Sequence, residues 1–363
     1  MINLEMWFGY VLRRVRSKMK QIFSKKSKIK KLLYVADRSC NRKAIDLVLN
    51  KMENLYPINC DKINIYNYAN NGFDLQKKYD VLIYHTFPHQ YHPTKWDDEI
   101  IKKTDEIFDK FHGLKIFHDS HDSGRVDSFS RFKDDDICRI KAWPSYGYID
   151  KFNPILTTMG GVGQLNNQLK SYLESVKIEK FLEWDNVWPN DKKNNGISYI
   201  VSYGYDEPEA ADYPTYISQK KGNEFVRENT RDVLKDYKRV ETDMVWKDSQ
   251  SDFHQHLKDT LVSVTVPGWG EGCLRQYEGP LFGCLNLMHE SISDIKLIPH
   301  EDLIDGEDFI SFNLENLHEK LDYIYDNRDE IDKIRFNGKL KLHKGSDLQK
   351  SAKKLYEKIL VKL

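Results

Sequence analysis

The chain has 363 residues, of which 31% are charged, 40% are hydrophobic and 12% are aromatic. These fractions exclude both a disordered chain and a polytopic membrane protein, and the length favours two domains. The 56 basic and 56 acidic side chains give zero net charge, so no overall field attracts polyanions and we expect no nucleic-acid partner.

The N-terminal arm, residues 1–30, differs in character from the rest of the chain. Residues 13–31 hold ten basic side chains and no acidic one, and they follow a stretch rich in aromatic and aliphatic residues. In a secretory signal the positive charges precede the apolar stretch. The reversed order favours an interfacial helix that binds an anionic membrane surface through residues 1–31. The alternative is a basic tail with no partner.

The cysteine pattern bears on the compartment. Cys40, Cys60, Cys138, Cys273 and Cys284 are odd in number, lie far apart and form no C-x-x-C pair. This pattern argues against a disulfide framework or a structural zinc site and favours a reducing compartment. We therefore expect a cytoplasmic protein, peripheral on the membrane if the arm binds lipid.

Short apolar runs and amphipathic stretches alternate along residues 31–190. Strands are predicted at residues 32–36, 61–68, 79–86, 114–119 and 154–159, and helices at residues 45–52, 100–111 and 165–173. Alternation of this kind indicates a parallel sheet with helices on both faces.

A second series follows the polar break near residue 190. Its predicted strands are residues 197–203, 239–245, 261–266 and 285–288, and its predicted helices are residues 224–237 and 274–282. Two helices close the chain, the second opened by a capping box of Ser346 and Gln349. The pattern predicts an α/β fold of two Rossmann-like parallel-sheet domains, residues 31–190 and 191–345, with residues 346–363 as a C-terminal helix. They would face a central cleft, the expected active site.

Residues 261–312 carry the main functional signal. A buried strand leads into a loop with Gly268, Gly270 and Gly272, and then into a short helix that bears Arg275 and Glu278. Backbone N–H groups in such a turn can approach a phosphate, and an arginine can pair with it bidentately. A carboxylate on the same helix face can accept hydrogen bonds from ribose hydroxyls. These features suit a nucleoside diphosphate, although Arg275 and Glu278 could also form an ion pair on a solvated face.

The same segment resembles a known family. The run R-x-x-E-x-x-x-x-G-C, from Arg275 to Cys284, is followed by Asp305-Gly306-Glu307-Asp308, a strand and an L-x-x-L helix. This order resembles the C-terminal half of two-domain, GT-B-like glycosyltransferases over about residues 197–340. The nearest likenesses are the group-1 type with a CgeB-like domain and the exostosin-like enzymes. The resemblance implies that Glu278 binds the ribose and Arg275 the diphosphate of a nucleotide sugar.

The chain also departs from this family. Many retaining members have seven residues between two glutamates, whereas six residues separate Glu271 from Glu278, so Glu271 does not safely inherit the first role. The further donor-binding candidates are Glu271, Gly270, Gly272, Lys220 and Lys221, the two lysines without a matching motif.

Histidines concentrate in the first half, after predicted strands. His118, Asp119, His121 and Asp122 follow one strand closely, and His85 lies at the end of another. An acceptor hydroxyl needs a general base in an inverting transfer, so we name Asp119 and His118 first and His121 and Asp122 second as catalytic candidates. The same cluster could instead bind a metal or cap the next segment.

These patterns predict a glycosyltransferase that moves a sugar from a nucleotide-diphosphate donor to a glycan or lipid-linked acceptor. We expect no cofactor, with the nucleotide sugar as substrate. The C-terminal half has no Asp-x-Asp motif, which favours metal independence but leaves a divalent metal open. Two alternatives remain: a metal-dependent hydrolase that uses the His118–Asp122 cluster, and a non-catalytic nucleotide- or sugar-binding protein.

Overall fold

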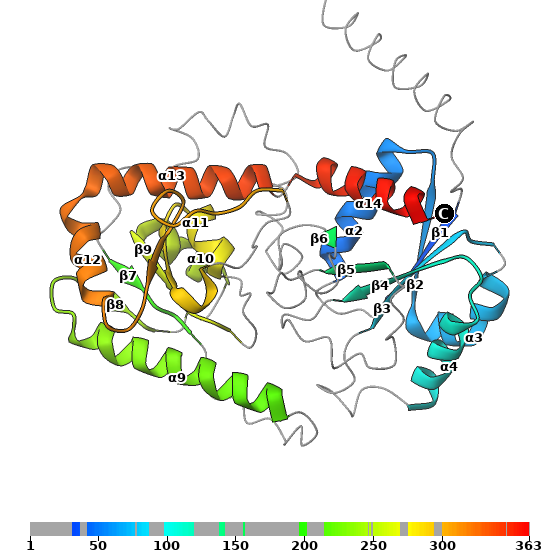
Figure 1. Ribbon diagram of the computed structural model, residues 1–363, viewed down its shortest axis with the longest axis horizontal. Coiled ribbons are helices and arrows are strands. Elements are labelled where there is room, and N and C mark those ends of the chain that lie inside the picture. Colours follow the sequence, from blue (N-terminus) through cyan, green and yellow to red (C-terminus); the bar gives the residue numbers. More distant parts are fainter. Residues whose placement is uncertain are drawn as a thin grey trace, which may run out of the picture.

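The structure consists of two α/β domains, each built on a parallel sheet (Figure 1). This computed structural model describes residues 31–36, 42–76, 78–86, 98–119, 138–141, 155–156, 196–201, 214–245, 247, 250–268, 275–293, 300–345 and 347–362. The predicted fold class of two Rossmann-like parallel-sheet domains is confirmed. The N-terminal arm and the predicted boundary near residue 190 lie outside the described residues.

The first domain has a sheet of order β2-β1-β3-β4-β5-β6. Its strands are β1 (Lys31–Ala36), β2 (Asn59–Asn64), β3 (Val81–Thr86), β4 (Leu114–Asp119), β5 (Cys138–Lys141) and β6 (Ile155–Leu156). Its described helices are α2 (Arg42–Leu55), α3 (Ile65–Gln76) and α4 (Asp98–Asp109). Side chains alternate across a strand, so Leu32 and Tyr34 of β1 share a core with α2, whereas Leu33 and Val35 face the core that holds α4.

The second domain has a sheet of order β11-β10-β9-β7-β8. Its strands are β7 (Ile197–Ser198), β8 (Thr242–Asp243), β9 (Val262–Thr265), β10 (Leu285–His289) and β11 (Ile310–Phe312). Its helices include α9 (Pro214–Asp236), α10 (Gln250–Asp259), α11 (Arg275–Leu281), α12 (Leu317–Asp326) and α13 (Arg328–Gly345). The chain leaves β7 for β8 on one side and then returns to β9 on the other, so the strand order reverses between β7 and β9. Ligands bind at such a switch point in open parallel sheets.

The C-terminal helix α14 (Leu348–Lys362) packs on the first domain, although it directly follows α13 of the second (Figure 1). Ala352, Leu355 and Ile359 lie in the core that also contains Leu32 of β1. Tyr356 stacks on Tyr56, with ring centroids 3.7 Å apart. The last helix therefore ties the end of the chain to the first sheet through apolar burial.

The structure differs from the sequence-based predictions at several elements. Residues 61–68 are not one strand, because β2 ends at Asn64 and α3 begins at Ile65. The helices α10 and α13 and the strand β5 were not predicted. In α13 the apolar period is interrupted by lysines and by Gly338. Only glycine fits at this position, because a Cβ atom there would lie 2.1 Å from the carbonyl oxygen of Asp308.

The start of α14 is capped by Asp347, since its Oδ1 atom accepts hydrogen bonds from the backbone N–H of Gln349 at 2.7 Å and of Lys350 at 3.2 Å. Ser346 of the predicted capping box lies outside the described residues. None of the helices that the structure describes combines the length and the apolar character needed to cross a membrane.

Replacement of Leu355 by alanine tests the packing of α14. Leu355 is fully buried, so its truncation should lower the free energy of unfolding by about 2–5 kcal/mol. Urea denaturation measures the loss, and hydrogen exchange should rise in peptides from α2 and β1. Lys353→Ala, at an exposed position on the same helix, is the matched control. Unchanged exchange in α2 and β1 would contradict the packing.

Candidate functional site

The carboxyl end of the second sheet, beside its switch point, holds the helix that the sequence singled out. Helix α11 follows β9, and α9 follows β7. Two side chains of α9 contact the chain just after β9. The Nε atom of Arg227 donates a hydrogen bond to the carbonyl oxygen of Pro267 at 2.8 Å, and Asn223 donates one to the carbonyl oxygen of Gly268 at 3.0 Å. Helix α9 therefore holds the start of the loop that leads into α11.

Arg275 and Glu278 both lie at the start of α11, as predicted. The Nε atom of Arg275 is buried and has no hydrogen-bond partner among the residues that the structure describes. Its guanidinium carbon lies 5.9 Å from the centroid of the Phe253 ring on α10. Glu278 is only 5% exposed. This burial excludes the alternative in which the two residues form an ion pair on a solvated face.

A close contact sets the distance between α11 and the sheet. A Cβ atom at Gly279 would lie 2.7 Å from the Cβ atom of Ser263 on β9, so only glycine allows this approach. At the first turn of α11, the side-chain nitrogen of Asn286 donates to the carbonyl oxygen of Gln276 at 3.2 Å. The Oδ1 atom of Asn286 accepts a 2.7 Å hydrogen bond from Thr265. The sheet therefore fixes the helix through packing and a buried polar network.

The end of α11 is fixed as well. Arg335 of α13 donates two hydrogen bonds to the carbonyl oxygen of Gly283, from Nε at 2.9 Å and from Nη2 at 2.7 Å. Gly283 has a φ of 82°, the left-handed conformation common after a helix. The Cys284 thiol donates to the carbonyl oxygen of Leu257 at the end of α10, with a sulfur–oxygen distance of 3.1 Å. Pro280 lies inside α11, which is only seven residues long, in agreement with the short helix predicted.

The Asp305-Gly306-Glu307-Asp308 motif has a structural role. Gly306 has a φ of 79°, and its N–H donates to the carbonyl oxygen of Phe309. Asp305 accepts a hydrogen bond from the backbone N–H of Ser311 at 2.7 Å. Asp308 accepts hydrogen bonds from Ile304 N–H and from the Lys341 ammonium of α13. The motif therefore shapes the turn before β11 and joins it to α13.

The structure locates only some of the other predicted donor residues. Gly270, Glu271 and Gly272 lie outside the described residues. Lys220 and Lys221 lie on α9, with side chains that are not described. Their donor-binding roles therefore stay predictions.

Two of the four predicted catalytic residues, His118 and Asp119, belong to the first sheet. His118 pairs in register with His85 of β3, and Asp119 pairs with Thr86, at the carboxyl ends of β4 and β3. Their side chains are not described, and His121 and Asp122 lie outside the described residues. Within the described part of the chain, no group of three or more histidine, cysteine, aspartate or glutamate side chains could hold a metal ion.

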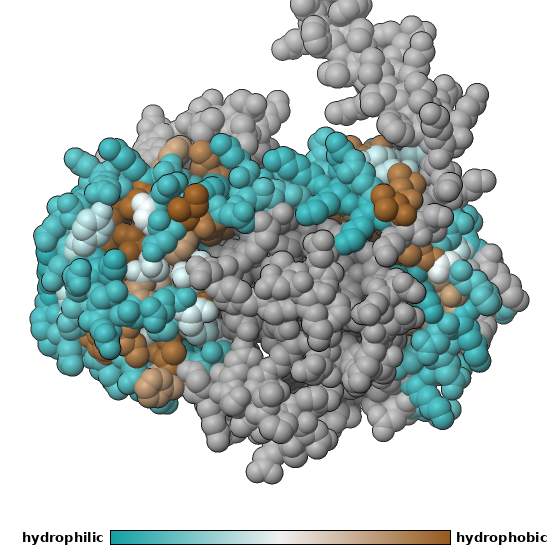
Figure 2. Space-filling model, viewed as in Figure 1, coloured by the Kyte–Doolittle hydropathy of each residue, from teal (hydrophilic) through white to brown (hydrophobic). Residues whose placement is uncertain are grey.

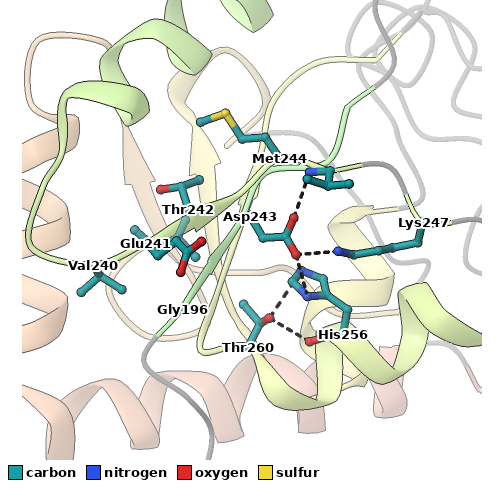
Figure 3. Close-up of a pocket in the computed structure, with 11 residues that line it drawn as sticks. Gly196, Val240, Glu241, Thr242, Asp243, Met244, Lys247, His256 and Thr260 are labelled. Atoms are coloured by element: carbon teal, nitrogen blue, oxygen red, sulfur yellow. Dashed lines mark hydrogen bonds and ion pairs between the residues drawn. The ribbon is translucent and has the colours of Figure 1, made fainter.

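Sequence reasoning missed a pocket of about 550 Å³ between the edge strand β8 and α10 (Figure 3). Asp243 lies at its centre and accepts a hydrogen bond from the Lys247 ammonium at 2.6 Å. Its Oδ2 atom lies 3.4 Å from Nδ1 of His256. Nε2 of His256 is in turn 3.5 Å from the Thr260 hydroxyl. No sequence motif marks this polar chain, because β8 and α10 bring it together.

The neighbours of Asp243 shift its titration. Burial acts to raise the pKa of this carboxyl, but the hydrogen bonds from Lys247 and from the Val245 N–H, with the nearby His256, outweigh burial and leave the pKa below its usual range. The carboxylate therefore stays ionised and holds the loop after β8 against α10.

Comparisons with known proteins concern the whole chain. No protein-family model matches this sequence, and no curated protein matches it. Several solved structures have a similar arrangement. One is an alpha-glucosyltransferase in complex with UDP-glucose and DNA containing an abasic site, with 10% identity and a TM-score of 0.49, covering 92% of this chain and 99% of that one.

Two further neighbours are similar to the same extent. Anabaena Alr3699/HepE, in complex with UDP and glucose, has 10% identity and a TM-score of 0.48, covering 92% of this chain and 100% of that one. A glycosyltransferase from Rickettsia africae ESF-5 has 11% identity and a TM-score of 0.48, covering 92% and 99%. Values this low assign no activity, so the chemistry of this chain depends on its own side chains.

The contact between Gly279 and Ser263 can be tested by a double substitution. Gly279→Ala should destabilise the protein by about 1–3 kcal/mol, because the new methyl group meets the Ser263 side chain. Ser263→Gly removes that obstacle, so the double variant should regain most of the loss beyond the cost of the second glycine itself. Denaturant titration of all four proteins measures the coupling. Simple additivity would show that the close approach is absent.

The Asp243 cluster predicts an acid-dependent stability. A carboxyl whose folded pKa is depressed stabilises the protein above its unfolded pKa of about 3.9, and this contribution is lost as the pH falls through the folded pKa. Asp243→Asn should therefore lower the melting temperature at neutral pH, with a difference that shrinks below about pH 4. Thermal melts across this range measure it. A pH-independent difference would contradict the ion pairs.

Proposed function

We propose that this protein is a glycosyltransferase that takes a nucleotide-diphosphate sugar as donor. The observation that carries the proposal is Arg275, whose buried Nε–H lacks a hydrogen-bond partner among the described residues at the carboxyl edge of a parallel sheet. A buried donor without a partner costs about 1–3 kcal/mol. A phosphate oxygen would satisfy this donor and neutralise the guanidinium charge.

Arg275 and Glu278 have complementary roles in this proposal. Arg275 binds the diphosphate and is oriented by the Phe253 ring, over which the guanidinium lies 5.9 Å from the ring centroid. Glu278, three residues further along α11, accepts hydrogen bonds from the ribose hydroxyls. During transfer the same guanidinium stabilises the negative charge that develops on the departing diphosphate, which lowers the barrier.

The first domain binds the acceptor in this proposal. His118 or Asp119, at the carboxyl end of β4, removes the proton from the acceptor hydroxyl if the transfer inverts configuration. We propose a glycan or lipid-linked acceptor and a cytoplasmic enzyme that works without a resident metal and without nucleic acid. Within the glycosyltransferases, the motif from Arg275 to Cys284 supports a group-1, CgeB-like or exostosin-like type.

A ligand-binding screen tests the donor site. UDP-, GDP-, ADP- and CDP-sugars are added in turn, and the matching nucleotide should raise the melting temperature, because binding to the native state stabilises it. Arg275→Met should weaken this ligand by about tenfold or more, since it removes charge-assisted hydrogen bonds worth about 1.5–3 kcal/mol. Glu278→Gln should weaken the nucleoside diphosphate as well, but not inorganic pyrophosphate.

The control is Arg239→Met, which removes an arginine of the same domain that pairs with Asp326. It should leave donor affinity unchanged. Chromatography detects transfer or slow hydrolysis of the sugar, and either reaction distinguishes an enzyme from a non-catalytic binding protein. DNA is included among the acceptors, and glucosylated DNA would overturn the proposed acceptor class. The proposed function would be overturned if no nucleotide sugar raised the melting temperature and the protein instead showed a hydrolase activity that depends on a tightly bound metal.

A further inference from the structure

Residues 300–309, which we call the strap, lie beside the connection between the two domains. Helix α13 ends at Gly345 and α14 begins at Leu348. Ile334 of α13 lies in the core of the second domain, whereas Leu355 of α14 lies in the core of the first. Each helix therefore moves with its own domain, and a change in the angle between α13 and α14 changes the angle between the domains.

The second half of the strap is bound to α13. The Asp308 carboxylate accepts a hydrogen bond from the Lys341 ammonium. The side-chain nitrogen of Asn337 donates to the carbonyl oxygen of Glu307 at 3.3 Å. Gly338 approaches the backbone of Asp308 so closely that a Cβ atom there would lie 2.1 Å from the carbonyl oxygen. Packing this close leaves little room for sliding, so this half of the strap moves with α13.

The first residue of the strap contacts α14 instead. Nε2 of His300 lies 2.9 Å from the Ser351 hydroxyl, and the same ring forms a hydrogen bond with the backbone of Asp347. Ser351 is fully buried, and Asp347 is the residue that caps α14. Figure 1 shows the segment before β11 running along α13 to the point where α14 begins. The strap therefore joins the two helices across their connection.

The contact between the strap and α14 is polar and lies beside water. Figure 2 shows a mainly hydrophilic surface where α13 meets α14, and Lys344, Gln349 and Lys350 are exposed there. His300 is only partly buried, so water and protons reach its ring. A hydrogen bond in such a place contributes far less than the apolar packing that holds each helix in its own domain. This contact can therefore open while both domains stay folded.

The surroundings of His300 favour its neutral form. Burial lowers the pKa of the ring, and the positive charges of Lys354 and Lys350 lower it further. The pKa stays lowered although Asp347 acts in the opposite direction and residues 301–302 of the strap are acidic. When the contact opens, the ring regains the ordinary histidine pKa of about 6.5. The closed contact is therefore most stable above this pH and loses stability as the pH falls through the lowered pKa.

We propose that the strap is a pH-sensitive clasp between the domains. With His300 neutral, it joins α13 to α14 and fixes the angle between the two domains. Protonation of His300 releases α14, and the connection between Gly345 and Leu348 is then free to bend. The proposal is independent of the donor site and of the proposed function, because it concerns only the contact between the strap and α14.

Hydrogen exchange of the full chain tests the clasp, in peptides from the end of α13 and the start of α14. Exchange is expressed as protection factors, which remove the intrinsic effect of pH on the exchange rate. Wild-type protection should fall by about threefold or more between about pH 7.5 and about pH 5.5, because one hydrogen bond is lost. His300→Ala should show the lower protection at both pH values. His300→Gln, which forms hydrogen bonds but does not titrate, should keep the higher protection at both.

The lysines of α14 supply a second arm. Lys354→Met should reduce the pH dependence, because it removes a positive charge that disfavours the protonated ring of His300. The matched control is Lys353→Met, at an exposed position on the same helix where the lysine pairs with Glu357. This control should leave the pH dependence unchanged. Equal effects of the two variants would contradict the role of His300.

Small-angle X-ray scattering tests the link to the angle between the domains. At neutral pH, His300→Ala should change the scattering curve of the wild type, and His300→Gln should not. The matched control is His318→Ala, which removes a 2.8 Å contact between His318 and the carbonyl oxygen of Val233 within the second domain. This control should change neither the scattering nor the exchange at the connection, and circular dichroism shows that each variant is folded. The proposal would be overturned by protection that responds neither to pH nor to His300→Ala, or by faster exchange with unchanged scattering.

Discussion

The close approach of α11 to β9 is the contact on which the candidate donor site depends. Gly279 lies against Ser263 with no space for a Cβ atom, and this places the start of the helix at the carboxyl edge of the sheet. Arg335 then fixes the other end of the helix through the Gly283 carbonyl oxygen. A short helix with an internal proline has little stability of its own. Its position therefore comes from its neighbours, and the orientation of Arg275 comes with it.

The same contacts connect the site to the far end of the chain. Arg335 belongs to α13, and α13 is followed directly by α14, which packs on the first domain. The helix that anchors α11 is thus continuous in sequence with the helix that holds the first sheet. One C-terminal segment therefore contacts the end of α11 through Arg335 and the first domain through α14.

Local sequence was informative where one element alone determines the pattern. The apolar run from Leu32 to Ala36 and the apolar positions of α2 were recognised because their periods are those of a strand and a helix. The prediction failed at α13, where Gly338 and buried polar residues such as Lys339 and Arg335 break the apolar period. Arg335 contacts the carbonyl oxygen of Gly283 after α11, and Gly338 lies against the carbonyl oxygen of Asp308; no local pattern reveals either contact.

The sequence by itself determined the alternation of strands and helices, the two-domain α/β fold and the presence of Arg275 and Glu278 on a short helix after a glycine-bearing loop. Only the tertiary structure decided that Glu278 is buried, that Arg227 donates a hydrogen bond to the Pro267 carbonyl oxygen, and that Asp305 and Asp308 shape a turn. It also decided that α14 joins the first domain. The reason is physical: periodicity reports which face of an element is buried, but the partner that buries it is often distant in sequence.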